Sequence, residues 1–181
     1  MEFRLLYVGK LGSNKNAKTK MEIRKQIHPQ LKKLWNSEPF KSFLWSDPGR
    51  IDYFKESVCG FEFITLITEK LSLFCELDIL FLRFGQPGSL YVGGDIDNRI
   101  KTLFDALSLP KANQLNDSIT FDDDEKPLYC LLKDDALITK VNIETDQLYV
   151  EEDPKMVRLI IKVKVRTTSQ TWLSHGLGIP S

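Results

Sequence analysis

The chain has 181 residues, of which 42% are hydrophobic and 28% are charged, and its formal net charge is zero. That length corresponds to about one domain, and the composition is typical of a globular protein with a buried core. No apolar run reaches the roughly 18 residues of a membrane-spanning helix. A neutral chain is also not a strongly basic nucleic-acid binder.

The charges are unevenly distributed along the chain. Residues 1–33 contain nine Lys or Arg and two Glu, a net charge of +7, so residues 34–181 carry −7. This separation suits a protein whose basic region binds phosphates and whose acidic region binds a metal ion. Ordinary solvated faces that happen to segregate are the alternative. The candidate phosphate contacts, which would bind DNA without reading its sequence, are Lys18, Lys20, Arg24 and Lys25.

The three cysteines, Cys59, Cys75 and Cys130, are widely spaced and lie among apolar residues. Zinc sites and disulfide frameworks use paired cysteines. We therefore expect buried free thiols in a reducing compartment. Because the N-terminus also lacks the apolar region of a signal peptide, we expect a cytoplasmic protein.

The first fifty residues predict a strand followed by a helix. Hydrophobic alternation over residues 2–9 indicates a strand, and the polar residues 12–16 indicate a loop. Apolar side chains at helical spacing predict a helix over residues 19–35, with a kink or a new helical piece at Pro29. The remainder up to Arg50 contains two prolines and a glycine, and we expect it to be irregular.

The middle of the chain predicts a hairpin. Residues 58–67 and 71–84 are rich in apolar and β-branched side chains and are separated by the polar residues 68–70. The second run alternates in part, which indicates a central strand.

A helix with an unusual polar face is predicted next. Its apolar residues recur at helical spacing, which places one face in a core; they are Ile96, Ile100, Leu103, Phe104 and Leu107. The neighbouring arc gathers charged and amide side chains, with Asp95 on the approach; these are Asp97, Asn98, Lys101 and Asp105. The helix should end before Pro110.

An acidic pair, Asp134 and Asp135, interrupts an apolar run further along the chain. Two carboxylates about 4 Å apart repel by roughly 4 kcal/mol at an effective dielectric near 20. A cluster of them needs a divalent cation, a raised pKa or separation into solvent. Magnesium prefers oxygen ligands and usually takes one or two carboxylates directly. Asp95, Asp97 and one of the later pair would supply enough ligands for one or two such ions.

Each of these polar residues also has a purely structural interpretation. Asp95 and Asp97 could be helix caps, because Asp satisfies free backbone amides at a helix start. Lys101 follows Asp97 by four residues and could form a surface ion pair with it. Asp105 is either a supporting contact of the site or an exposed acid of the helix.

The order Gly-Asp-Ile-Asp-Asn-x-x-Lys-x-x-x-Asp-Ala-Leu, followed by Asp-Asp, resembles the RusA family of Holliday-junction resolvases. The resemblance covers residues 95–107 and 134–138. It implies a small homodimeric endonuclease that uses Mg²⁺, or Mn²⁺ in its place, to hydrolyse phosphodiester bonds in four-way DNA junctions during recombination and repair. The alternative is a DNA-binding or protein-interaction module on the same fold, whose acidic site is vestigial.

The resemblance also implies roles for individual residues. Asp95, Asp97 and Asp135 match the metal-binding acids, and Asp134 would assist them. Lys101 matches the essential lysine, which would contact the scissile phosphate or activate water. The remaining motif positions, Asn98 and Asp105, would contact these side chains and hold them in position without binding the metal themselves.

The last third of the chain predicts an insert and two strands. Residues 110–129 form an acidic insert, which we expect to be solvated and mobile around its run of Asp122 to Glu125. An edge strand is expected near residues 135–143 and a last strand at residues 156–165. The whole chain, residues 1–181, is therefore predicted to be a single RusA-like α+β domain with a mixed or antiparallel sheet packed with helices.

Overall fold

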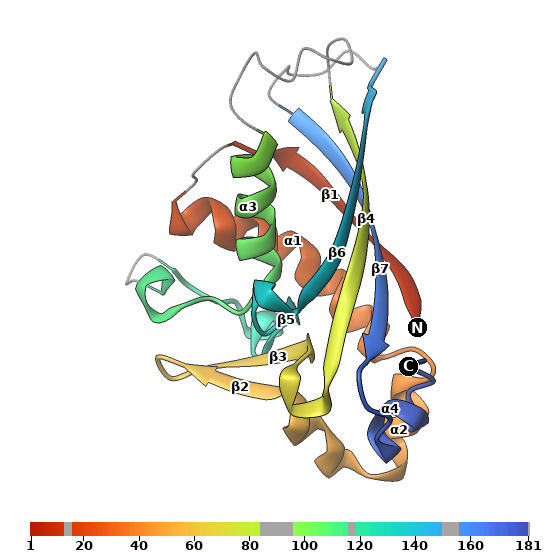
Figure 1. Cartoon of the computed structure of the whole chain (residues 1–181). Helices are drawn as coiled ribbons and strands as arrows, with labels where there is room; N and C mark the ends of the chain where they lie inside the picture. The colour runs from red at the N-terminus through yellow and green to blue at the C-terminus, as the bar shows by residue number, and fades with distance from the viewer. Residues whose placement is uncertain (13–15, 84–95, 116–118, 150–155, 181) are drawn as a thin grey trace.

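The computed structural model describes residues 1–12, 16–83, 96–115, 119–149 and 156–180, apart from the side chain of Leu173. These residues form one α+β domain with two mixed β-sheets and several helices (Figure 1). The expected fold class is thus confirmed at this level.

The larger sheet has four strands in the order β1-β7-β4-β6. Its strands are β1 (Glu2–Lys10), β7 (Met156–Thr167), β4 (Leu73–Arg83) and β6 (Ile138–Gln147). The pairs β1–β7 and β7–β4 are antiparallel, whereas β4 and β6 are parallel. Every second residue of β4 is buried, so one face of this sheet forms the core. The predictions of a central β4, an edge strand and a last strand are confirmed.

The smaller sheet has three strands in the order β2-β3-β5, namely β2 (Lys55–Val58), β3 (Phe61–Ile67) and β5 (Leu128–Leu132). β2 and β3 form an antiparallel hairpin, and β3 pairs with β5 in parallel. The hairpin turns at Cys59 and Gly60, whose φ angles are 50° and 80°. Positive φ at both turn residues matches the right-handed twist of the two strands.

The predicted hairpin between residues 58–67 and 71–84 is wrong. β3 and β4 belong to different sheets, because the chain changes direction between them. A 3₁₀ turn, η2 (Glu69–Leu71), is followed by Ser72 with φ 56°, a left-handed conformation. β3 then pairs with β2 and β5, while β4 pairs with β7 and β6.

Three longer helical segments pack around the sheets. They are α1 (Ala17–Trp35), α2 (Phe40–Ser46) and α3 (Ile96–Leu107), and the short α4 (Trp172–Gly176) follows β7. The 3₁₀ segments are η1 (Pro48–Phe54), η4 (Ala112–Gln114), η5 (Asp123–Glu125) and η6 (Asp135–Leu137). α1 is one helix through Pro29, and α3 ends before Pro110 as predicted. The segment expected to be irregular instead holds α2 and η1.

The core lies between α1, α3 and the inner face of the larger sheet (Figure 1). A second cluster includes Met21 of α1, Phe63 of β3, and Phe121 and Leu128 from the predicted insert. The insert is therefore not simply solvated. The acidic 3₁₀ turn η5 is bound to α1: Lys25 of α1 pairs with Glu125 (2.6 Å), and His28 Nε2 of α1 lies 3.2 Å from the Asp124 carbonyl.

Cys75 and Cys130 are buried free thiols, as expected, and burial raises the pKa of each, to about 12 and about 11. Cys59 is exposed in the β2–β3 turn, so the expectation that it is buried is wrong. In the part of the chain that the structure describes, no helix has both the length and the apolar character to cross a membrane.

Candidate functional site

The polar face of α3 is set by its buried stripe. Ile100, Leu103 and Leu107 are buried against the core, which turns Asp97 and Lys101 toward solvent. Residues four apart on a helix lie on the same face, about 6 Å apart along the axis. Asp97, Lys101 and Asp105 therefore form one line of alternating charge along α3, in which Asp97 and Lys101 are exposed and Asp105 is half-buried.

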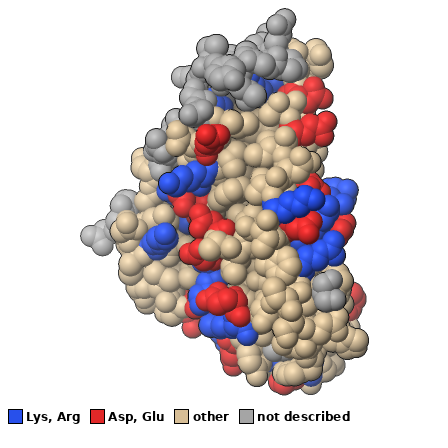
Figure 2. Space-filling view, in the orientation of Figure 1, with Lys and Arg blue, Asp and Glu red and all other residues tan. Residues whose placement is uncertain are grey.

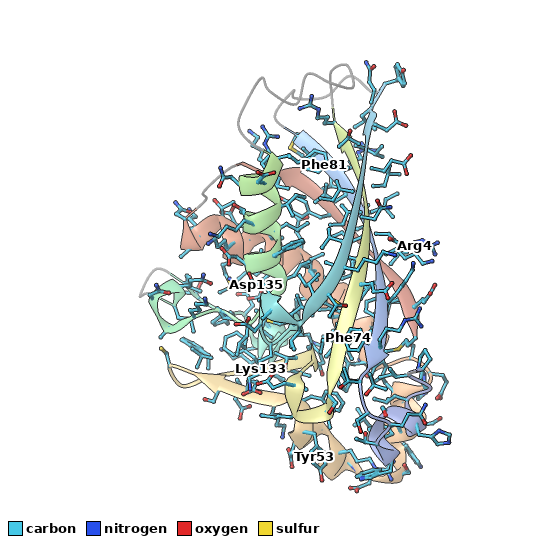
Figure 3. All side chains as sticks on the ribbon, in the orientation of Figure 1. Arg4, Tyr53, Phe74, Phe81, Lys133 and Asp135 are labelled. Atoms are coloured by element: carbon cyan, nitrogen blue, oxygen red, sulfur yellow. The ribbon has the colours of Figure 1, made fainter. Side chains whose placement is uncertain are left out.

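The acidic pair lies at the start of η6, which packs against α3 and β4. The Asp134 carboxylate accepts a hydrogen bond from the Ala136 backbone N–H (2.9 Å) and so caps this turn. Asp135 is exposed, and Figure 3 shows it beside the C-terminal end of α3. The two halves of the motif, far apart in sequence, are thus neighbours in the fold.

A pocket of about 220 Å³ joins the end of α3 to the acidic pair, and we call it the acidic pocket. Its carboxylates are Asp105, Asp134 and Asp135, and its cations are Lys111 and Lys133. Part of this charge is already compensated. Asp105 pairs with Lys20 of α1 at 2.5 Å, and Lys133 pairs with Glu69 at 2.6 Å. That second pair raises the pKa of Lys133, because the Glu69 carboxylate stabilises its ammonium form.

Three motif side chains remain uncompensated. Within the described ranges, Asp97, Lys101 and Asp135 are exposed and make no ion pair or side-chain hydrogen bond. Lys101 does not pair with Asp97, so the surface-pair interpretation of Lys101 does not describe this structure. Figure 2 shows acidic and basic patches alternating down the face that carries α3 and η6. These three residues are therefore available to a ligand.

The predicted metal ligands are brought together only in part. Asp95 lies outside the described residues, and among the residues that are described no three His, Cys, Asp or Glu side chains gather as a metal-binding group. Asp105 lies at the acidic pocket, but Asp97 is two helical turns away, about 12 Å along the axis. Asn98 is half-buried, and its backbone carbonyl accepts a hydrogen bond from Thr102. Convergence of Asp95, Asp97 and Asp135 stays a prediction.

The basic residues proposed to contact DNA have different surroundings. Lys20 and Lys25 are held by Asp105 and Glu125, and Lys18 lines a small pocket with Lys25. Arg24 is only 2% exposed, so it cannot reach a DNA phosphate without unfolding its surroundings. Arg24 therefore has a structural role.

Arg24 was expected to contact DNA phosphates, but in the structure it holds the C-terminal end of α3 in place. Its guanidinium donates to the backbone carbonyls of Asp105 and Ser108, the latter at 2.9 Å, and to the Gln114 side chain at 2.8 Å. It therefore caps the C-terminal end of α3 beside the acidic pocket, where a cation is favoured by the helix dipole. Its spacing could have shown this, because it is in register with the buried Ile27, Leu31 and Trp35.

Comparisons with known proteins add no relative: no family model, no curated protein and no solved structure matches this chain.

Proposed function

We propose that this protein is a divalent-metal-dependent endonuclease that hydrolyses phosphodiester bonds in branched DNA, in the manner of the RusA resolvases that its motif resembles. One observation carries the proposal. The fold packs η6 against α3, and on these two elements the side chains of Asp97, Lys101 and Asp135 are exposed and make no ion pair among the described residues. Unpaired charges of both signs suit a site that handles a metal ion and a phosphate together.

The donor chemistry of this face fits magnesium. Its side chains offer carboxylate oxygens, and Mg²⁺ needs only one or two of these because it keeps water or phosphate oxygens elsewhere. Asp95, Asp97 and Asp135 would hold the ion, with Asp134 assisting, and Mn²⁺ is the other candidate. The bound metal would polarise the phosphoryl oxygen and lower the pKa of water.

The remaining residues have supporting roles in this proposal. Lys101, exposed between Asp97 and Asp105, would offset the charge that develops on the scissile phosphate. Lys20 and Arg24 of α1 anchor α3. Lys20 does so through the Asp105 carboxylate, and Arg24 through backbone carbonyls at the end of the helix. Contacts to DNA phosphates are proposed for Lys18, Lys20 and Lys25. A homodimer would present two such sites to a symmetric junction.

The test is cleavage of a labelled four-way junction by the purified chain in Mg²⁺ and in Mn²⁺. The wild type should cut. Asp97→Asn should not cut but should still bind the junction, because the change removes one negative charge and keeps the side chain's size. Asp123→Asn is the control, since Asp123 is another exposed acid, on η5, whose ion pair is with Lys126 three residues away, and it should cut normally.

Two results would contradict the proposal. Undiminished cleavage by Asp97→Asn would remove Asp97 from the chemistry. Binding by the wild type without cleavage in either metal would favour the alternative, a DNA-binding module with a vestigial acidic site.

A further inference from the structure

Trp45 is the most exposed tryptophan of the chain, with 86% of its surface open to solvent. It lies on α2, at the lower end of the molecule beside α4 (Figure 1). α2 buries Phe40 and Phe43, and at about 100° per residue this turns Lys41 and Trp45 to the outer side of the helix. Among the described residues, Trp45 makes no ring contact, cation–π contact or side-chain hydrogen bond. Its indole ring is therefore available to a planar ligand.

The other exposed tryptophan, Trp172 of α4, provides a contrast. It is 58% exposed, but the Arg50 guanidinium lies 5.1 Å from its ring centroid. Tyr53 also packs against it edge-on, with the ring centroids 6.4 Å apart. The ring of Trp172 is thus engaged by other side chains of the chain, whereas the ring of Trp45 is not.

Two hollows border Trp45. The larger, of about 470 Å³, is lined also by Trp35, Asn36, Lys41, Leu44 and Pro48. The smaller, of about 270 Å³, is lined also by Glu38, Lys41 and Ser42. Leu44 and Ser42 fall on opposite sides of Trp45 in a helical projection, so the two hollows lie on two sides of the indole. Each has room for a planar ring the size of a nucleobase.

The ring of Trp45 is carried by a helix that is fixed before any ligand binds. Phe40 packs against Trp35 with their ring centroids 4.6 Å apart. Arg50 donates hydrogen bonds to the Phe43 carbonyl (3.0 Å) and the Ser46 hydroxyl (2.8 Å), which stabilises the C-terminal end of α2. Because α2 is fixed and a tryptophan side chain has only two torsions to order, binding to this ring costs little conformational entropy.

The charge around Trp45 suits a phosphate on one side of the ring. Lys41 borders both hollows and makes no ion pair among the described residues. No acid lines the larger hollow, whereas Glu38 lines the smaller one, where its carboxylate accepts a hydrogen bond from the Ser42 backbone N–H (3.3 Å). An exposed aromatic ring beside a cation is how proteins hold single-stranded nucleic acids, because the ring stacks on a base and the cation contacts the backbone.

We infer that Trp45 stacks on the unpaired bases of a single nucleic-acid strand, whose backbone passes Lys41 on the side of the larger hollow. A duplex does not fit, because its paired bases stack on one another and present no free face. A proline-rich peptide needs a groove lined by several aromatic rings. Here Trp35, the other aromatic residue of the larger hollow, is only 3% exposed.

This site rests on α2 and not on the acidic residues of α3 and η6, so it does not depend on the proposed function. Within that function it would hold an unpaired stretch of the DNA. The two can fail separately. A chain that binds strands through Trp45 and cuts no junction would refute the nuclease and support the stacking site. A chain that cuts junctions but binds no single strand would do the reverse.

The first test locates the bound strand by tryptophan fluorescence, with EDTA present to prevent metal-dependent cleavage. Oligothymidylate of about six nucleotides should quench the emission of the wild type to saturation, because a stacked base lies against the Trp45 ring. An abasic strand of the same length carries the same phosphates and no bases. It should quench far less.

The second test measures affinity by the fluorescence anisotropy of labelled oligothymidylate. Trp45→Ala should weaken binding about 5- to 150-fold, the range for the loss of one stacked base. Trp45→Phe keeps an aromatic face and should fall between Trp45→Ala and the wild type. Lys41→Gln should reduce the salt slope of log affinity by about 0.7, which corresponds to one phosphate contact on a single strand.

Trp172→Ala is the matched control, because it removes the other exposed tryptophan, and it should bind oligothymidylate as the wild type does. Equal affinity for the abasic strand, or unchanged affinity in Trp45→Ala, overturns the inference. So does a decaproline peptide that quenches Trp45 where oligothymidylate does not, since the site would then be a peptide groove. Thymidine monophosphate should bind more weakly than the strand, and equal affinity would overturn the assignment to a strand.

Discussion

Removing the buried guanidinium of Arg24 should destabilise the protein strongly. Arg24 is 2% exposed, and its donors serve the backbone carbonyls of Asp105 and Ser108 and the side chain of Gln114. In Arg24→Ala these three acceptors lose their partner in the interior. Each buried acceptor left without a donor costs about 1–3 kcal/mol.

One opposing effect reduces the total loss in the free energy of unfolding that these three unpaired acceptors would cause. Burial lowers the pKa of Arg24, which means that the charged form is held in the interior at some cost. Removal of the side chain recovers part of that cost, so we expect a loss of about 3–5 kcal/mol in the free energy of unfolding. Arg24→Lys keeps the charge but cannot reproduce the planar fork of donors. It should therefore fall between Arg24→Ala and the wild type.

Urea denaturation at neutral pH measures these differences. Lys33→Ala is the matched control, because Lys33 is an exposed cation on the same helix, and it should stay within about 0.5 kcal/mol of the wild type. A loss below about 1 kcal/mol in Arg24→Ala would refute the reasoning. It would mean that water or a neighbouring side chain satisfies the carbonyls at the end of α3.

Three further predictions concern stability. His28 Nδ1 accepts a hydrogen bond from the Tyr129 backbone N–H (2.9 Å), and burial lowers the pKa of His28 from 6.5 despite the opposing influence of Asp124 and Glu125. Because the unfolded chain then binds this proton more readily, the free energy of unfolding should fall as the pH drops below about 6.5. This fall should be smaller in His28→Gln, and equal pH profiles in urea titrations would contradict the idea. Leu103→Ala, at a side chain with no exposed surface, should cost about 2–5 kcal/mol. By contrast, Lys101→Ala on the same helix should leave the thermal midpoint nearly unchanged, and similar effects of the two would disprove the assignment of faces. Gly60→Ala should cost about 1 kcal/mol, because its φ of 80° disfavours a β-carbon, and an unchanged melting temperature would show that the turn relaxes.

The sequence by itself determined the elements whose pattern is local. Alternation along β1, β4 and β7 identified strands that bury one face, because successive side chains point to opposite sides of a sheet. The stripe through Ile100, Leu103 and Leu107 identified α3 and turned its charged side chains outward. The motif on α3 and the acidic pair were visible for the same reason, since they interrupt or border these patterns.

The partners of each element were decided only by the tertiary structure. Nothing in residues 58–84 distinguishes a hairpin from two strands in different sheets, because strand pairing depends on the direction of the chain after Ser72 and on the distant β5 and β7. The role of Arg24 depended in the same way on α3 packing against α1, which places helix carbonyls beside a cation that the sequence alone shows only as charged. Charge is a local property of the sequence, but burial and pairing are properties of the assembled fold, and they decide which charged residues remain available to a ligand.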